Sequence, residues 1–235
     1  MQHSDEKELM DSPGASPRLL EADLGNLRTL NRVLGAKRGI FKFLAATLDR
    51  NGMKEFSLLD VGTGSADIPI AIVEWARKRG LAARIAALEP HPVTAAVARR
   101  RAADYPEIAI IRADGFVPPF KPGSFDFVLA SQVLHHFSED QITTLLRVWA
   151  ETARRALLVS DLVRHPLAYC GIKLLTVLFT TNQMTRVDAP LSVRRAFTVE
   201  EWRSLFRRAG VGPAEVLTLF PFRVFARLRL GHETL

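Results

Sequence analysis

The sequence predicts an α/β fold in which helices cover both faces of a mostly parallel sheet. Two observations support this prediction. Short apolar runs alternate with helical patterns from about residue 56 onward, and five of these runs end in a polar residue. The chain has 235 residues, 48% of them hydrophobic and 24% charged, which suits one domain with a substantial core.

The first 50 residues precede this alternation. Residues 1–17 are polar and contain Ser12-Pro13-Gly14-Ala15-Ser16-Pro17, which predicts a mobile leader. From residue 18 to residue 50, leucines and other apolar residues recur at helical spacing and are interrupted near Gly35. We therefore expect two helices that form an N-terminal helical cap over residues 18–50.

The main domain is predicted to span residues 51–235. Ser138 and Gln141 have the spacing of a helix capping box, and Thr198 and Glu201 repeat that spacing before a helix that ends at Gly210. The end of the chain is expected to form a closing β-hairpin, at 214–220 and 222–230. The other strands are expected at 56–61, 84–89, 108–111, 125–131 and 156–161, and the helices between them at 66–78, 93–103 and from 139.

An insertion interrupts the alternation at residues 162–197. We expect an apolar helix at 167–180, followed by a polar loop at 181–190. An insertion at this place in an α/β chain is suited to form a lid over a site. The apolar stretch is too short to span a membrane.

Ligands in an open parallel sheet bind beyond the carboxyl ends of the strands. The first strand leads into Asp60, Gly62 and Gly64, and glycines in such a turn allow a ligand to approach the backbone. Asp67 stands where a diphosphate-binding turn has its third glycine, so a ligand with cationic character is favoured over a dinucleotide. The alternative is a turn that needs glycine for its geometry alone.

Two further carboxylates end the second and third strands. Glu89 is placed to accept the hydroxyls of a ribose, although it could instead cap the next helix. Asp114 could accept from an exocyclic amine while Gly115 and Phe116 lie along a purine ring, or it could simply form an Asp-Gly turn. Together with the glycine turn, these positions predict a site for a nucleoside-containing ligand.

These motifs resemble those of class I S-adenosylmethionine-dependent methyltransferases, near the small-molecule branch that includes the ubiquinone and menaquinone C-methyltransferases. The resemblance covers residues 55–220 and rests on residues 58–67, 87–90, 112–115 and 125–137 and on the helix before Gly210. It implies a Rossmann-like, seven-stranded sheet whose last strand runs antiparallel. The family often has a third glycine where this chain has Ala66.

The resemblance also implies the cofactor S-adenosyl-L-methionine, with S-adenosyl-L-homocysteine as product. The glycine turn would hold the amino acid part, Glu89 the ribose and Asp114 the adenine. The cofactor-binding residues expected from this are Asp60, Gly62, Thr63, Gly64, Asp67, Glu89, Pro90, Asp114, Gly115, Phe116, Ser131 and Gln132.

The acceptor side is predicted from the loop after the fourth strand. An acceptor hydroxyl needs a base, and His136, or else His135, could take its proton, although one of two adjacent histidines is usually structural. A second resemblance, to bacterial enzymes of polyketide and other secondary metabolism, rests on residues 24–27 and 192–197 and favours a phenolic, enolic or quinol-like acceptor.

Lid residues form a further set of candidates. Arg164 could orient an acceptor carbonyl or carboxylate, and His165 lies next to it. Arg186 and Asp188 could form an ion pair that holds the lid shut. No His, Cys, Asp or Glu set has the spacing of metal ligands, so no metal is expected.

The net charge of +7 leaves alternatives open. Basic residues are dispersed, so nucleic acid is an unlikely partner, but an RNA methyltransferase remains the enzyme alternative, and weak contact with anionic membranes is also left open. A cofactor-binding partner protein without catalysis is the third hypothesis. The single cysteine, Cys170, is expected to be buried, and a chain without disulfides fits the cytoplasm.

Overall fold

The computed structural model describes residues 1–12, 14, 16–35 and 37–230. Its centre is a seven-stranded sheet in the order β3-β2-β1-β4-β5-β7-β6. Only β7 runs antiparallel to its neighbours, which confirms the predicted α/β fold with one reversed strand. The strands are β1 (Glu55–Val61), β2 (Ala82–Leu88), β3 (Ile108–Ile111), β4 (Phe125–Ser131), β5 (Ala153–Leu162), β6 (Ala214–Leu219) and β7 (Arg223–Arg229).

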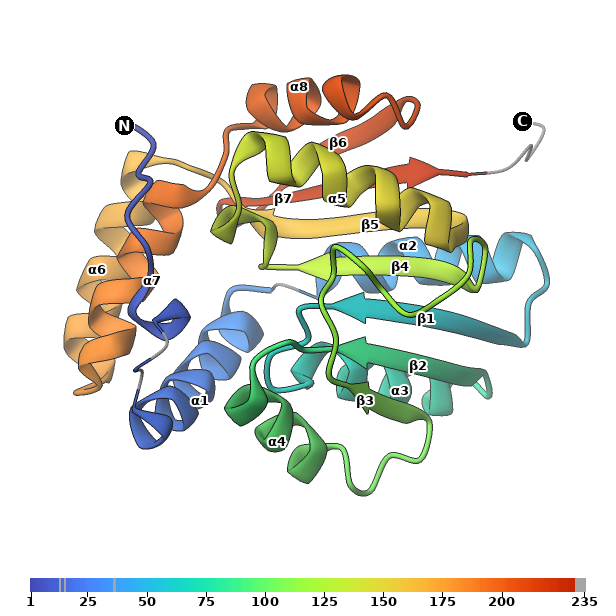
Figure 1. Ribbon diagram of the computed structural model, residues 1–235, viewed down its shortest axis with the longest axis horizontal. Coiled ribbons are helices and arrows are strands. Elements are labelled where there is room, and N and C mark those ends of the chain that lie inside the picture. Colours follow the sequence, from blue (N-terminus) through green and yellow to red (C-terminus); the bar gives the residue numbers. More distant parts are fainter. Residues whose placement is uncertain (13, 15, 36, 231–235) are drawn as a thin grey trace.

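Alternate side chains of the strands point to opposite faces and build two cores. In β1, Leu58 packs into the core beneath one set of helices and Leu59 into the core beneath the other, and both side chains are fully buried. The predicted cover on both faces is thereby confirmed (Figure 1). Helices α2 (Arg38–Arg50), α3 (Asp67–Lys78) and α4 (Pro92–Arg101) lie on one face, and α5 (Glu139–Thr152) and α8 (Val199–Ala209) on the other.

A third group of helices lies across the carboxyl ends of the parallel strands (Figure 1). It consists of α1 (Pro17–Val33) from the N-terminal cap, and α6 (Pro166–Phe179) and α7 (Gln183–Arg195) from the insertion after β5. Asn26 of α1 donates to the hydroxyl of Thr180 at 2.8 Å, and the Thr185 hydroxyl donates to Asp23 at 2.6 Å. The cap and the insertion, far apart in the sequence, therefore form one cover.

The predicted polar loop at 181–190 is wrong, because these residues belong largely to α7. The Asn182 side chain accepts hydrogen bonds from the Met184 and Thr185 amides and so caps the helix. Thr185 and Asp188 then point inward, where partners from the N-terminal region satisfy them. Their polarity reflects tertiary hydrogen bonds and does not mark a loop.

The N-terminal segment is part of this cover and not a separate leader. The Ser4 amide donates to the Arg194 carbonyl at 3.2 Å, and the short helix η1 (Leu9–Asp11) follows. The amides of Leu9 and Met10 donate to the Asp188 carboxylate at 2.8 and 3.0 Å. Residues 13 and 15 of the expected leader lie outside the described residues.

Cys170 is exposed on α6, which corrects the expectation of a buried thiol. Its apolar neighbours do not bury it, because no other element of the described residues packs on one side of α6. Within the described ranges, no helix is both long and apolar enough to cross a membrane.

Candidate active site

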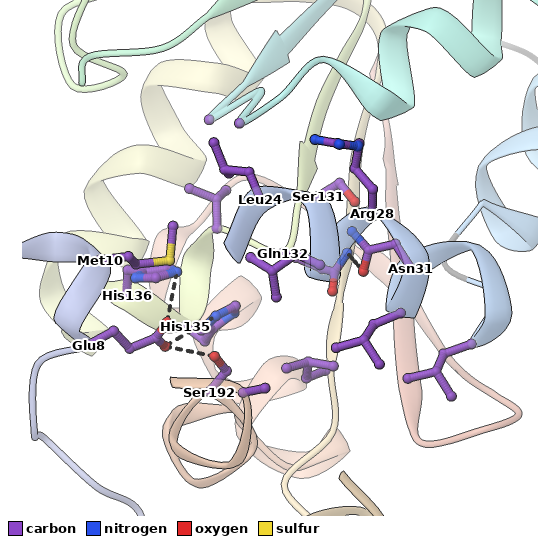
Figure 2. A pocket seen from close by; sticks show the side chains of 18 of the residues that line it. Glu8, Met10, Leu24, Arg28, Asn31, Ser131, Gln132, His135, His136 and Ser192 are labelled. Carbon is purple, nitrogen blue, oxygen red and sulfur yellow. Dashed lines mark hydrogen bonds and ion pairs between the residues drawn. The ribbon is translucent and has the colours of Figure 1, made fainter. Parts of the chain in front are cut away.

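A cavity of about 580 Å³ lies between the sheet edge and the cover of α1, α6 and α7. One part of its wall is polar and comes from the turns after β1, β2 and β4. The opposite part is largely apolar and comes from α1 and α6. This volume is in the range that small-molecule sites usually have. Figure 2 shows part of the cavity wall, with Glu8 and the two histidines on one side and Arg28 and Asn31 on the other.

The turn between β1 and α3 brings backbone to the cavity. Gly62 and Gly64 have φ angles of +70° and +56°, in the left-handed region that favours glycine. A Cβ on Gly64 would meet nothing within 4 Å, whereas one on Gly62 would lie 2.5 Å from Cγ2 of Val133. Gly64 therefore leaves open space for a ligand, and Gly62 is required by packing. Ala66 also has a positive φ, of 59°, in the region that favours glycine.

A buried carboxylate, Asp60, and a partly buried one, Asp67, accompany this turn. Burial raises the pKa of Asp60 to about 7 and also raises the pKa of Asp67. Among the described residues, Oδ1 of Asp60 and Oδ2 of Asp67 have no hydrogen-bond partner. Buried acceptors without partners are uncommon in proteins, so both atoms are available to a cationic donor from a ligand.

Glu89, at the end of β2, is turned toward the same glycine turn. Its Oε2 accepts from the Gly64 amide and its Oε1 from the His91 amide, both at 3.0 Å. Burial raises the pKa of Glu89 to about 7. Pro90 and Thr63 line the cavity beside these groups. The structure thus brings the residues expected after β1 and β2 together at one end of the cavity.

The residues expected after β3 lie elsewhere. Asp114, Gly115 and Phe116 do not line the cavity. Asp114 accepts from the Phe116 amide at 2.9 Å, as in an Asp-Gly turn, and the Gly115 carbonyl accepts from the Trp149 indole at 2.9 Å. A Cβ on Gly115 would lie 2.9 Å from Val61, so this glycine serves packing. Phe116 is in edge contact with Phe137, which does line the cavity.

Ser131 and Gln132 line the cavity at the end of β4. The Gln132 amide donates to Oδ1 of Asn31 at 2.7 Å, which ties this turn to α1. Arg223 at the start of β7 is buried, and its burial lowers the pKa of its guanidinium to about 10. Its Nε and Nη1 atoms have no hydrogen-bond partner within the described part of the chain.

The two adjacent histidines have different partners. Nδ1 of His135 lies 2.7 Å from Oδ1 of Asp161, and Nδ1 of His136 lies 2.8 Å from Oδ2 of Asp11. Their Nε2 atoms face Glu8, at 3.7 Å and 3.9 Å from its carboxylate oxygens (Figure 2). The N-terminal segment therefore supplies two carboxylates to the histidine loop.

The two imidazoles differ in the charges that surround them. Burial alone would lower the pKa of His136, but the charges of Glu8 and Asp11 outweigh it and raise the pKa to about 9. His136 is therefore protonated at neutral pH. The charge and hydrogen bond of His135 lower the pKa of Asp161 in spite of its burial, so Asp161 stays ionised and holds the His135 ring.

Glu8, His135 and His136 also form the one group of potential metal ligands that the described residues bring within 4.8 Å of one another. The sequence had predicted no metal-ligand set. Protonated His136 already faces the Glu8 carboxylate at 3.9 Å, and the Arg195 side chain donates to the His135 carbonyl at 3.0 Å. The arrangement is an ion-pair network that fastens the N-terminal segment.

The lid residues expected from the sequence do not line the cavity. Arg164 pairs with Glu201, and the His165 ring accepts from the Leu167 amide at the start of α6. The expected ion pair between Arg186 and Asp188 is wrong. Arg186 donates to the carbonyls of Thr180 and Val177, and Asp188 binds the amides of η1 instead.

Sequence reasoning missed the residues that reach the cavity from outside the strand ends. Glu8 and Met10 come from the assumed leader, and their short helical segment carries no recognisable ligand motif. Arg223 also lines the cavity, and an arginine at the start of the predicted strand 222–230, next to apolar residues, was a usable signal. Arg28 and Asn31, which were also missed, come from α1.

Residues 59–156 match a family model described as a methyltransferase domain. The matched segment runs from β1 to β5 and is less than half of the chain, and the fold is that of the class I S-adenosylmethionine-dependent methyltransferases. No sequence among the curated proteins matches the chain.

Solved structures support the fold at low sequence identity. Magnesium protoporphyrin IX methyltransferase from Synechocystis PCC 6803, solved with bound SAH, is 15% identical, with a TM-score of 0.57 over 85% of this chain and 84% of that one. A putative methyltransferase from Methanococcus maripaludis is 14% identical, with a TM-score of 0.63 over 92% and 95%. Human N-acetylserotonin methyltransferase, in complex with SAM, is 16% identical, with a TM-score of 0.66 over 97% of this chain and 64% of that one.

Proposed function

We propose that the protein transfers a methyl group from S-adenosyl-L-methionine to a small hydrophobic acceptor that carries an ionisable oxygen, such as a phenol, enol or quinol. The observation that carries this proposal is the division of the cavity. Its carboxylate-rich end suits a cationic cofactor, and its apolar end, on α1 and α6, suits a hydrophobic acceptor.

The cofactor is proposed to lie along the turns after β1 and β2. The free carboxylate atoms of Asp60 and Asp67 would accept from its ammonium group, and Glu89 would accept from the ribose hydroxyls. Gly64 leaves the space that the backbone approach needs. The guanidinium of Arg223 is available for the cofactor carboxylate. Adenine recognition by Asp114 and Phe116 stays a prediction. It would require the turn after β3 to reach the cofactor past Phe137, which contacts Phe116 and lines the cavity.

The acceptor is proposed to occupy the apolar end. Leu27 and Leu30 of α1 and Ile172 and Leu175 of α6 line this region. Two structural relatives methylate small molecules according to their names, a magnesium porphyrin in one case and N-acetylserotonin in the other. An apolar cavity of this size favours such an acceptor over an RNA chain.

Methyl transfer is an in-line displacement at the methyl carbon, in which the carbon–sulfur bond breaks as the carbon–oxygen bond forms. The acceptor hydroxyl must lose its proton for this. We assign the proton to Nε2 of His135 in the neutral form of the ring, in which Nδ1 keeps its proton and donates it to Asp161, because His136 is already protonated. The cover of α1, α6 and α7 would exclude water from the reacting atoms.

Calorimetric titration of the full chain with S-adenosylhomocysteine tests the cofactor assignment. One bound molecule per chain is the expected result, and the absence of binding would contradict the proposal. Assays with labelled S-adenosylmethionine and a panel of phenols and quinols then test the acceptor class. Cofactor binding without transfer to any acceptor would favour a non-catalytic partner protein, and salt-sensitive RNA binding with transfer to RNA would favour the RNA methyltransferase.

A further inference from the structure

Helix α6 presents an apolar surface that no other element of the described chain covers. Its exposed residues recur at a spacing of three or four along one side of the helix, and Phe179 at its end is 78% exposed. Monomeric soluble proteins rarely expose a contiguous apolar patch of this kind without a function. We name it the α6 face, and define it by Leu167, Cys170, Leu174, Val177, Leu178 and Phe179, all exposed.

The other side of the same helix lines the cavity. Ala168, Ile172 and Leu175 lie on that side, and Leu167 is both 65% exposed and part of the cavity wall. Helix α6 therefore separates the apolar end of the cavity from the outer surface, and Leu167 lies where the two meet.

Charge along the segment that contains α6 has one sign. No Asp or Glu occurs between Asp161 and Asp188, whereas Lys173 and Arg186 are both exposed in that stretch. Val187, near the end of α6, is also half exposed and extends the apolar area onto α7. Apolar side chains flanked by cations match the surface of an anionic lipid bilayer, in which the apolar groups enter the acyl boundary and the cations meet the headgroups.

We propose that the α6 face docks onto an anionic membrane surface. Docking places Leu167 at the bilayer, so a hydrophobic acceptor dissolved in the membrane can enter the cavity without crossing water. This route rests on the proposed function, but docking itself does not require it. A second copy of the chain is the competing occupant of the α6 face, since two such faces could pair, but an equally basic surface on both copies disfavours that contact.

Cys170 provides a direct probe, because it is the single cysteine of the chain and lies on the α6 face. The full chain is labelled there with a polarity-sensitive fluorophore and mixed with vesicles of phosphatidylcholine, with or without one third phosphatidylglycerol. We expect a blue-shifted emission and co-sedimentation with the phosphatidylglycerol vesicles only, and weaker binding as salt rises.

Matched variants locate the surface. Leu178→Ser combined with Phe179→Ser should weaken vesicle binding at least about 10-fold, since each change removes an exposed apolar group from the contact. Val117→Ser, at another exposed apolar residue, is the control and should bind as the wild type does. The affinity for S-adenosylhomocysteine should be the same in all of them, because none of the three residues lines the cavity.

Three results would overturn the proposal. The first is wild-type protein that stays in the supernatant when it is mixed with anionic vesicles. The second is a double variant that binds these vesicles as tightly as the wild type does. The third is light scattering that shows a dimer for the wild type and a monomer for the double variant. Retained S-adenosylhomocysteine binding in any of these cases would leave the proposed methyltransferase function intact.

Discussion

Nδ1 of His135 lies 2.7 Å from Oδ1 of Asp161, and both side chains are almost fully buried. His135 follows the carboxyl end of β4, and Asp161 lies at the carboxyl end of β5, 26 positions further along the chain. Asp161 also accepts from the backbone amides of Leu134 and Leu162. It therefore joins the histidine loop to β5 and orients the His135 ring toward the cavity.

Asp161→Asn should destabilise the protein at pH 7 by about 3 kcal/mol, because it removes one partner of a buried charge-assisted contact. The pKa of Asp161 is lowered in the folded state, so its contribution is present above the ordinary pKa of an aspartate and is lost as the pH falls through the folded value. Urea unfolding should show a constant difference in the free energy of unfolding between the wild type and Asp161→Asn from pH 5 to pH 8. Asp140→Asn, on the exposed surface of α5, is the control; equal stability of wild type and Asp161→Asn would argue against the contact.

The pKa of His136, about 9, should fall toward its ordinary value in Glu8→Gln, because Glu8 supplies much of the charge that raises it. In the wild type, this raised pKa stabilises the fold fully below about pH 6.5, and the contribution disappears as the pH rises through 9. An NMR titration of the histidine rings measures both proteins. Asp5→Asn, at a fully exposed carboxylate, is the control, and a wild-type pKa near 6.5 would refute the network with Glu8.

Asp60→Asn should stabilise the ligand-free protein at pH 8 and abolish S-adenosylhomocysteine binding. The folded-state pKa of Asp60 is about 7, well above its ordinary value, so its ionisation costs stability as the pH rises from about 4 to 7. At pH 4 the two proteins should have similar melting temperatures. Thermal unfolding at both pH values, with calorimetry for the ligand, measures the effects; a variant that melts lower at pH 8 and binds normally would contradict them.

Substitutions of the two turn glycines should distinguish the glycine that leaves space for a ligand, Gly64, from the glycine that packing requires, Gly62. Both require a positive φ, so alanine costs about 1 kcal/mol at either position. Gly62→Ala should cost more, because its Cβ would meet Val133 at 2.5 Å, and Val133→Ala should restore part of that loss. Gly64→Ala should fold and weaken S-adenosylhomocysteine binding. Denaturant unfolding and calorimetry distinguish the two, and equal effects at both glycines would contradict this assignment.

Much of the fold could be predicted because its signals are local. The apolar run that ends at Asp60 is a strand, and the capping boxes at Ser138 and Thr198 mark helices that the structure contains. The resemblance to methyltransferases was likewise readable from the strand ends, since each motif is a short contiguous segment. The site could be predicted only in part. The predicted part is formed by turns in which neighbouring residues of the chain would contact the ligand.

The sequence by itself determined the order of the strands and of the helices between them, the class of fold and the glycine turn with its carboxylates, because these depend on periodicity and on neighbouring residues. Tertiary structure alone decided the rest. It folded residues 181–190 into α7, since Thr185 and Asp188 find partners in α1 and η1 that no local pattern reveals. It also brought Glu8 within 4 Å of His135 across 127 positions of the chain, because charges that pair in a buried site need proximity in space and not in sequence.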